Sequence, residues 1–262
     1  MGKSVAEFDY EMAVTGFSLF PGVVPDDLLA RLRADIPRRQ EACRQAQLRN
    51  GLSSGMEGAA HHLVGGNDSL SDFLGRLYLH EFIAAYFGGG AYILNSYGAL
   101  NNLPYSEDAY WHGHNFHRDV RTFSGDFRLM LNMLVMVDDF TVENGATKVV
   151  PGTHRREGRP SDDYLAGHAV QVTGMAGSIV LFDSNLWHSA APNRTTVPRM
   201  ALTLTFTRSF VKQQMDYPRM LGEDYPKTEE MRQLLGYNAR VPASYDEWYQ
   251  PPERRMYKPG QG

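Results

Sequence analysis

The sequence predicts a mainly β fold, an antiparallel sandwich or barrel, with helices flanking it. Between about residues 91 and 211, short apolar segments are β-branched or alternate with polar residues, and Gly, Pro, Asn and Asp separate them. This pattern is typical of strands joined by tight turns. No run of ten or more helix-patterned residues interrupts the segments, which disfavours a parallel sheet with crossover helices.

The first part of the chain, about residues 1–90, is expected to be helical. Residues 25–50 start with an Asp pair at a capping position and repeat apolar residues at helical spacing, and Pro37 should kink or end the first segment. The Gly- and Ser-rich residues 51–67 predict a long loop. A second helix is predicted over residues 71–87, where three glycines follow.

The expected strands are the segments AYILNSY, RLMLNMLVMV, TKVVPG, HAVQVT, SIVLF and MALTLTFTRSFV. Beyond residue 212 the chain is polar again, with a helix predicted over residues 228–235 and a tail rich in Pro and Tyr. We therefore expect one domain over residues 1–262. It would consist of a helical part, a β core over about 91–211 and an extension over 212–262.

Composition disfavours several classes of protein. The formal net charge is −4 and the pI is about 6.1, so no basic footprint for nucleic acid is present. No apolar run reaches the roughly 20 residues of a spanning helix, and the first residues lack the pattern of a secretory leader. The single cysteine, Cys43, cannot form an intramolecular disulfide, which favours a reducing, cytoplasmic location. The sequence gives no indication of oligomeric state.

Three residues have the types and spacing of a metal site. His117 and Asp119 lie two apart, so on an extended segment both side chains leave the same face. His188 follows the apolar segment SIVLF, far enough downstream to return on a facing strand. Two histidines and one carboxylate form the facial triad typical of non-haem iron(II). A His-x-Asp pair alone is weak support, because a hydrogen-bonded surface pair is common.

Arg199 follows the second histidine by eleven residues, at the start of the segment MALTLTFT. A guanidinium there could bind the far carboxylate of a dicarboxylic co-substrate with two hydrogen bonds. Without the triad, an ordinary surface arginine at a strand end would be the favoured interpretation.

Over roughly residues 91–210 these motifs resemble the phytanoyl-CoA dioxygenase family. The most specific pieces are the segment ENGATKVVPGTH and the run LFDSNLWHSAAPN. The resemblance implies a double-stranded β-helix (a jelly roll, cupin-like) and an oxygenase that uses Fe(II), 2-oxoglutarate and O2. It maps the metal ligands onto His117, Asp119 and His188 and the co-substrate arginine onto Arg199.

One position departs from the family and another agrees with its oxygenases. Many members carry Ser or Thr two residues after the distal histidine, where it touches the co-substrate, but this chain has Ala190. We expect Asn132 to help instead, although it could merely satisfy backbone groups. Halogenating relatives replace the carboxylate ligand by Ala or Gly, so Asp119 favours oxygen insertion, desaturation or oxidative ring closure.

Aromatic and polar residues near these motifs suggest a small polar substrate, such as a sugar-containing natural product. Cations there are too scattered to favour the phosphates of CoA, although an acyl-CoA or another small molecule remains an alternative. If residues 112–119 form one strand, His112 and His114 face away from the metal, unless a bulge at Gly113 reverses them. The candidate substrate contacts are Trp111, His114, Tyr97 and Trp187.

Two rival hypotheses keep the fold and change the function. A zinc or manganese site of the cupin kind could perform hydrolysis or isomerisation, and the His-x-His pair at 112–114 is a frequent zinc chelate. A jelly-roll protein could also bind a ligand or metal without catalysis, because fold does not dictate function.

Overall fold

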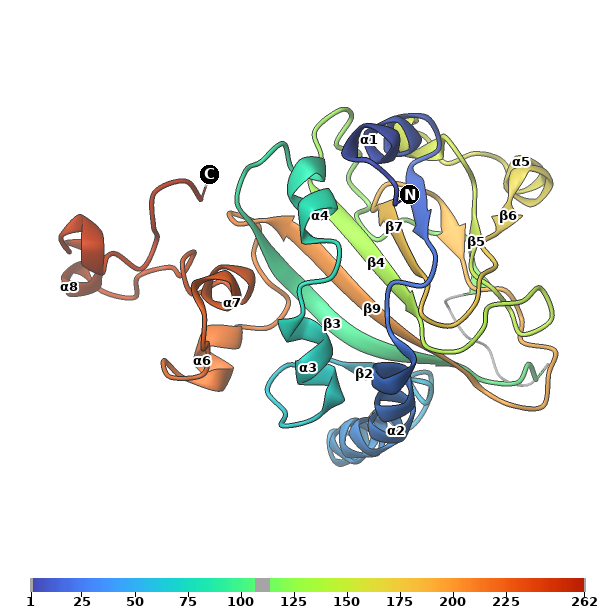
Figure 1. Cartoon of the computed structure of the whole chain (residues 1–262), viewed down its shortest axis with the longest axis horizontal. Coiled ribbons are helices and arrows are strands. Elements are labelled where there is room, and N and C mark those ends of the chain that lie inside the picture. Colours follow the sequence, from blue (N-terminus) through green and yellow to red (C-terminus); the bar gives the residue numbers. More distant parts are fainter. Residues whose placement is uncertain (1, 107–113, 262) are drawn as a thin grey trace.

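The computed structural model describes residues 2–106 and 114–261, and its centre is a pair of antiparallel sheets (Figure 1). The larger sheet has six strands in the order β1-β7-β4-β9-β3-β2, and the smaller has three in the order β6-β5-β8. The strands are β1 (Phe17–Phe20), β2 (Ala59–His61), β3 (Tyr92–Asn102), β4 (Met130–Met136), β5 (Lys148–Val149), β6 (Val170–Gln171), β7 (Ile179–Asp183), β8 (His188–Ser189) and β9 (Arg199–Arg208).

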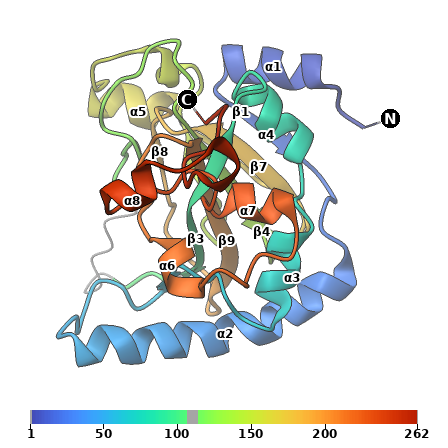
Figure 2. The ribbon, with the colours of Figure 1, turned by 90° about the vertical axis from the view of Figure 1, so that its left-hand side faces the viewer.

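Most helices cover one face of the large sheet or extend the chain beyond one end of it, whereas α5 (Asp162–His168) lies beside the small sheet (Figures 1 and 2). The helices are α1 (Val5–Val14), α2 (Asp26–Arg49), α3 (Ser69–Gly75), α4 (His80–Tyr86), α5 (Asp162–His168), α6 (Tyr217–Leu221), α7 (Glu229–Leu234) and α8 (Tyr245–Trp248), with 3-10 turns at Thr153–Arg155 and Pro252–Arg254. Within the described residues, no helix has both the length and the apolar character needed to cross a membrane.

Strand alternation divides the buried apolar residues into two cores. On β4, Leu131, Met133 and Val135 pack with the helices on the outer face of the large sheet. Leu134 and Met136 point the other way, into a second core between the two sheets. We call the face toward the small sheet the inner face, and it is the face on which the candidate site lies.

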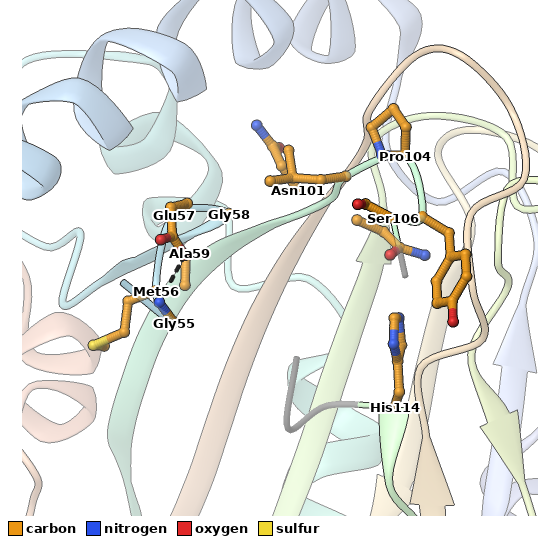
Figure 3. A pocket seen from close by; sticks show the side chains of 12 residues that line it. Gly55, Met56, Glu57, Gly58, Ala59, Asn101, Pro104, Ser106 and His114 are labelled. Atoms are coloured by element: carbon orange, nitrogen blue, oxygen red, sulfur yellow. Dashed lines mark hydrogen bonds between the residues drawn. The ribbon is translucent and has the colours of Figure 1, made fainter. Parts of the chain in front are cut away.

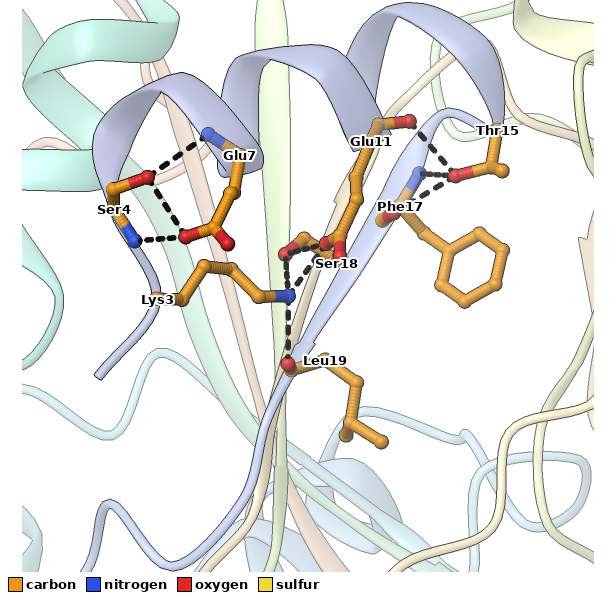
Figure 4. Close-up of polar contacts among 8 residues, drawn as sticks. All are labelled: Lys3, Ser4, Glu7, Glu11, Thr15, Phe17, Ser18 and Leu19. Carbon is orange, nitrogen blue, oxygen red and sulfur yellow. Dashed lines mark hydrogen bonds and ion pairs between the residues drawn. The ribbon is translucent and has the colours of Figure 1, made fainter. Parts of the chain in front are cut away.

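The first helix is fixed to the edge strand β1 by a polar cluster (Figure 4). Ser4 and Glu7 form a capping box at the start of α1, which satisfies two unpaired backbone N–H groups. Lys3 Nζ donates to Glu11 Oε2 at 2.5 Å and to Ser18 Oγ at 2.7 Å. The cluster thereby links α1 to the strand that completes the large sheet.

The strands expected after residue 91 are confirmed, and so is a helix at α7. The N-terminal part is less uniformly helical than predicted, because it contributes β1 and β2 to the large sheet. The helix predicted over residues 71–87 is two helices, separated where Leu77 and Leu79 take positive φ angles. In addition, α2 continues past Pro37 instead of ending there.

Candidate metal centre

His117, Asp119 and His188 come together on the inner side of the fold. One ligand atom from each lies within 4.8 Å of the others. Asp119 Oδ1 is 3.7 Å from His117 Nε2, and Asp119 Oδ2 is 3.7 Å from His188 Nε2. The two histidines sit opposite each other because their backbones exchange hydrogen bonds of 2.9 and 3.0 Å. No other group of three or more His, Cys, Asp or Glu residues in the described part of the chain has such spacing.

Backbone contacts fix which nitrogen of each histidine can bind a metal. His117 Nδ1 lies 2.8 Å from the carbonyl oxygen of Asn115, and His188 Nδ1 lies 2.9 Å from that of Leu186. A carbonyl oxygen accepts a hydrogen bond only from a protonated Nδ1, and in a neutral imidazole this leaves the lone pair on Nε2. Both Nε2 atoms face Asp119, so the donor set suits a divalent ion.

The surroundings also favour the neutral form of His188. Burial lowers the pKa of this histidine, and the Asp119 carboxylate opposes the shift. Metal ligation requires neutral imidazole, so burial prepares the residue for that role.

Asn132, on the inner face of β4, supports the carboxylate ligand. Its amide nitrogen donates to Asp119 Oδ2 at 2.8 Å, and its amide oxygen is buried without a partner in the described residues. Asn132 is paired with Thr205 on the neighbouring strand β9. Thr205 follows Arg199 by six residues, so the two positions are about 20 Å apart along that strand. Asn132 therefore lies at the triad end of the site, and direct contact with a co-substrate stays a prediction.

We expect Asn132→Leu to weaken iron binding about ten- to a hundred-fold, because the ligating carboxylate loses its orienting donor. Anaerobic titration of the metal-free protein with Fe(II) measures this. Asn101→Leu is the control, because Asn101 lies on β3 and binds Gln40 on α2. Equal iron affinity in both variants would show that the contact with Asp119 is dispensable.

Arg199 is a buried cation at the start of β9. Nε donates to the carbonyl of Asn144 and Nη2 to that of Gly145, each at 3.3 Å, and the guanidinium lies 3.7 Å from the centre of the Phe140 ring. Burial lowers the pKa of Arg199 to about 10, although Asp138 opposes the change. Nη1 is buried without a hydrogen-bond partner in the part of the chain that is described. The group is therefore suited to receive an anion.

A pocket lies beside this end of the site (Figure 3). The loop over residues 55–58 and the start of β2 form one side, and Pro104, Ser106 and His114 form the other. Burial lowers the pKa of His114, and Lys148 lowers it further. His114 therefore lines the pocket and precedes the proposed metal ligand His117 by three residues. Trp111, another predicted substrate contact, lies outside the described residues.

Two of the predicted substrate contacts, Tyr97 and Trp187, are not among the described residues that line this pocket. Tyr97 is fully buried on the outer face of β3, and its hydroxyl donates to the carbonyl of Leu70 at 3.1 Å. The centre of the Trp187 ring lies 5.1 Å from the guanidinium carbon of Arg118 and 5.6 Å from that of Arg159. Arg118 points away from the triad and donates to the carbonyls of residues 153, 156 and 157. The Tyr97 ring therefore stabilises the scaffold, whereas a substrate contact by Trp187 stays a prediction.

The parity argument assumed one strand over residues 112–119, and the described residues 114–119 form none. Residue 114 has 3-10 conformation, residue 115 is a bend, and His117 forms only an isolated bridge. The parity argument for His114 therefore fails. Asn102, Gly145 and Phe140, which surround Arg199, were not identified from the sequence because their roles depend on distant segments meeting.

Comparisons with known proteins agree with this geometry. The chain matches the Phytanoyl-CoA dioxygenase (PhyH) family over residues 14–201. It is 45% identical over 149 residues to the Uncharacterized protein Rv1501 of Mycobacterium tuberculosis, covering 56% of this chain and 55% of that one. It is 28% identical over 187 residues to Dioxygenase cdmA of Talaromyces verruculosus, covering 65% and 59%. The chain thus spans a little over half the length of these curated relatives.

Solved structures show the same fold at low sequence identity. AviO1 from Streptomyces viridochromogenes matches with a TM-score of 0.58 and 24% identity, over 78% of this chain and 95% of that one. The non-heme alpha ketoglutarate dependent epimerase SnoN matches with a TM-score of 0.57 and 24% identity, over 78% and 82%. The predicted double-stranded β-helix is confirmed. Because the family match covers residues 14–201, which is most of this chain, the chain belongs to the phytanoyl-CoA dioxygenase family of 2-oxoglutarate-dependent non-haem iron dioxygenases.

Proposed function

We propose that this protein is an Fe(II)- and 2-oxoglutarate-dependent oxygenase acting on a small polar molecule. The observation that carries the proposal is the triad of His117, Asp119 and His188, whose ligand atoms lie within 4.8 Å of one another. Three protein ligands on one side of an iron ion leave positions for a chelating co-substrate and O2.

Each residue has a definite task in this proposal. The two histidines and Asp119 hold iron, and Asn132 orients Asp119 through its 2.8 Å hydrogen bond. Arg199 binds the far carboxylate of 2-oxoglutarate through Nη1, which otherwise lacks a partner in the described structure. When bound, iron and 2-oxoglutarate supply the oxidising power, while the protein places the substrate and excludes water.

The substrate proposed is a small polar molecule of the kind that a sugar-containing natural product represents. The pocket in Figure 3 has Asn101, Ser106, Tyr105 and His114 in its lining, together with apolar Met56 and Leu103. None of the described residues that line it is Lys or Arg, so it offers no site for the phosphates of CoA. Hydrogen-bonding groups beside flat rings suit a hydroxylated ligand with an apolar face.

Two experiments test the proposal. Anaerobic addition of Fe(II) and 2-oxoglutarate should produce a weak visible charge-transfer band, which a zinc hydrolase or a non-catalytic ligand-binding protein would not show. Succinate release is then measured with a set of glycosides and a set of acyl-CoA thioesters. Turnover of acyl-CoA with none on any glycoside would refute the sugar hypothesis while leaving the reaction class intact.

A further inference from the structure

Arg199 and Asn102 share the same two backbone acceptors. They are paired across β9 and β3 on the inner face of the large sheet. Asn102 Nδ2 lies 3.3 Å from the carbonyl oxygen of Asn144 and 3.2 Å from that of Gly145, the two carbonyls that also accept from Arg199. A third contact, of 3.0 Å, joins Asn102 Nδ2 to the carbonyl of Ala191. One neutral amide thus ties together the loop before β5 and the segment after β8.

The close approach depends on a glycine. Gly145 has a φ of +78°, and a Cβ there would lie 2.3 Å from the carbonyl oxygen of Ala191 and 2.4 Å from Asn102 Nδ2. Any side chain would push the loop away from Asn102. The loop therefore reaches the arginine only because this residue has no side chain.

The same arrangement leaves the positive charge of Arg199 uncompensated. Asp138 is the acid whose charge raises the pKa of Arg199. Its carboxylate already forms an ion pair with Arg33 at 3.0 Å and accepts a hydrogen bond from the backbone N–H of Met200 at 2.8 Å. In the described structure no carboxylate forms an ion pair with Arg199. Asn102 fixes the acceptors for two guanidinium nitrogens without adding a negative charge, so Nη1 remains available.

We propose that Asn102 is a positioning residue that holds the Arg199 guanidinium ready for the carboxylate of the co-substrate. The inference rests on the proposed function, because it assumes that Arg199 binds 2-oxoglutarate. Asn102 acts through Arg199 and is not one of the three residues of the metal triad. An acid cannot replace Asn102, because a carboxylate has no N–H groups to donate to the backbone carbonyls. It would also pair with the Arg199 guanidinium and so compete with the co-substrate carboxylate.

The test is the dissociation constant of 2-oxoglutarate, measured by calorimetry on the Fe(II) protein without oxygen. Asn102→Leu should raise this constant about ten-fold, because the guanidinium loses its fixed acceptors. Asn102→Asp, which keeps the size of the side chain, should raise it at least as much. The matched control is Asn95→Leu, which removes a buried Asn near the opposite end of β3, where Nδ2 donates to the carbonyl of Lys212 at 3.1 Å, and should leave the constant unchanged.

A double-mutant cycle separates positioning from general destabilisation. In an Arg199→Met background, Asn102→Leu should have little further effect on 2-oxoglutarate binding, because the group it positions is gone. Additive effects, or an unchanged constant in Asn102→Leu, would overturn the inference. If Arg199→Met itself binds 2-oxoglutarate normally, the co-substrate assignment fails first. Iron affinity and melting temperature, measured in every variant, identify any variant that has merely unfolded.

Discussion

Replacing His188 by Ala is expected to abolish 2-oxoglutarate-dependent succinate formation. The triad provides only three ligands within 4.8 Å, and no fourth His, Cys, Asp or Glu of the described chain joins this group. Loss of one imidazole should therefore release the iron instead of merely weakening a redundant site. His117→Ala and Asp119→Ala should have the same effect. The measurements are iron content after anaerobic loading and the rate of succinate release.

The control for these variants is His168→Ala. His168 lies at the end of α5, is exposed and contacts the carbonyl of Tyr164, so its removal should leave iron content and turnover unchanged. Far-UV circular dichroism should show that the triad variants keep their fold, because the core packs without these side chains. Succinate release near the wild-type rate in any triad variant would remove that residue from the metal site.

The triad was predictable because its spacing in the chain reflects local geometry. His117 and Asp119 are two residues apart, and His188 follows a strand whose apolar residues mark it as buried. The residue types and the spacing indicated the triad although residues 117–119 form no strand, because an isolated bridge to His188 holds His117 in place instead. Arg199 was found in the same way, from its position at the start of the next long strand.

The residues that support the ligands were harder to predict, because their partners are distant in the sequence. Asn102 meets Asn144 and Ala191 only after three segments converge, and no local pattern encodes such a meeting. Tyr97 was misplaced because an aromatic residue on a strand fits either face, and the helices that cover the outer face determine which one is buried. The edge strand β1 was missed because its four residues are too few to show alternation clearly.

Arg199→Met is expected to raise the KM for 2-oxoglutarate about ten- to a hundred-fold while leaving iron affinity unchanged. A charge-assisted contact of this kind is worth roughly 1.5–3 kcal/mol. Methionine keeps most of the side-chain volume against Phe140, whose ring centre lies 3.7 Å from the guanidinium. Arg199→Lys should recover only part of the affinity, because an ammonium cannot reproduce the planar set of donors.

Stability should move in the opposite direction from co-substrate binding. The guanidinium is buried, its pKa is lowered to about 10, and Nη1 has no partner among the residues described. An apolar replacement removes a buried and incompletely paired charge, which is often neutral or stabilising. The melting temperature of the Arg199→Met protein, measured without 2-oxoglutarate, should therefore equal or exceed that of the wild type. Adding 2-oxoglutarate with Fe(II) under anaerobic conditions should raise the melting temperature of the wild type far more than that of the variant. A clearly lower melting temperature combined with an unchanged KM would identify Arg199 as a structural residue and refute its assignment as the co-substrate anchor.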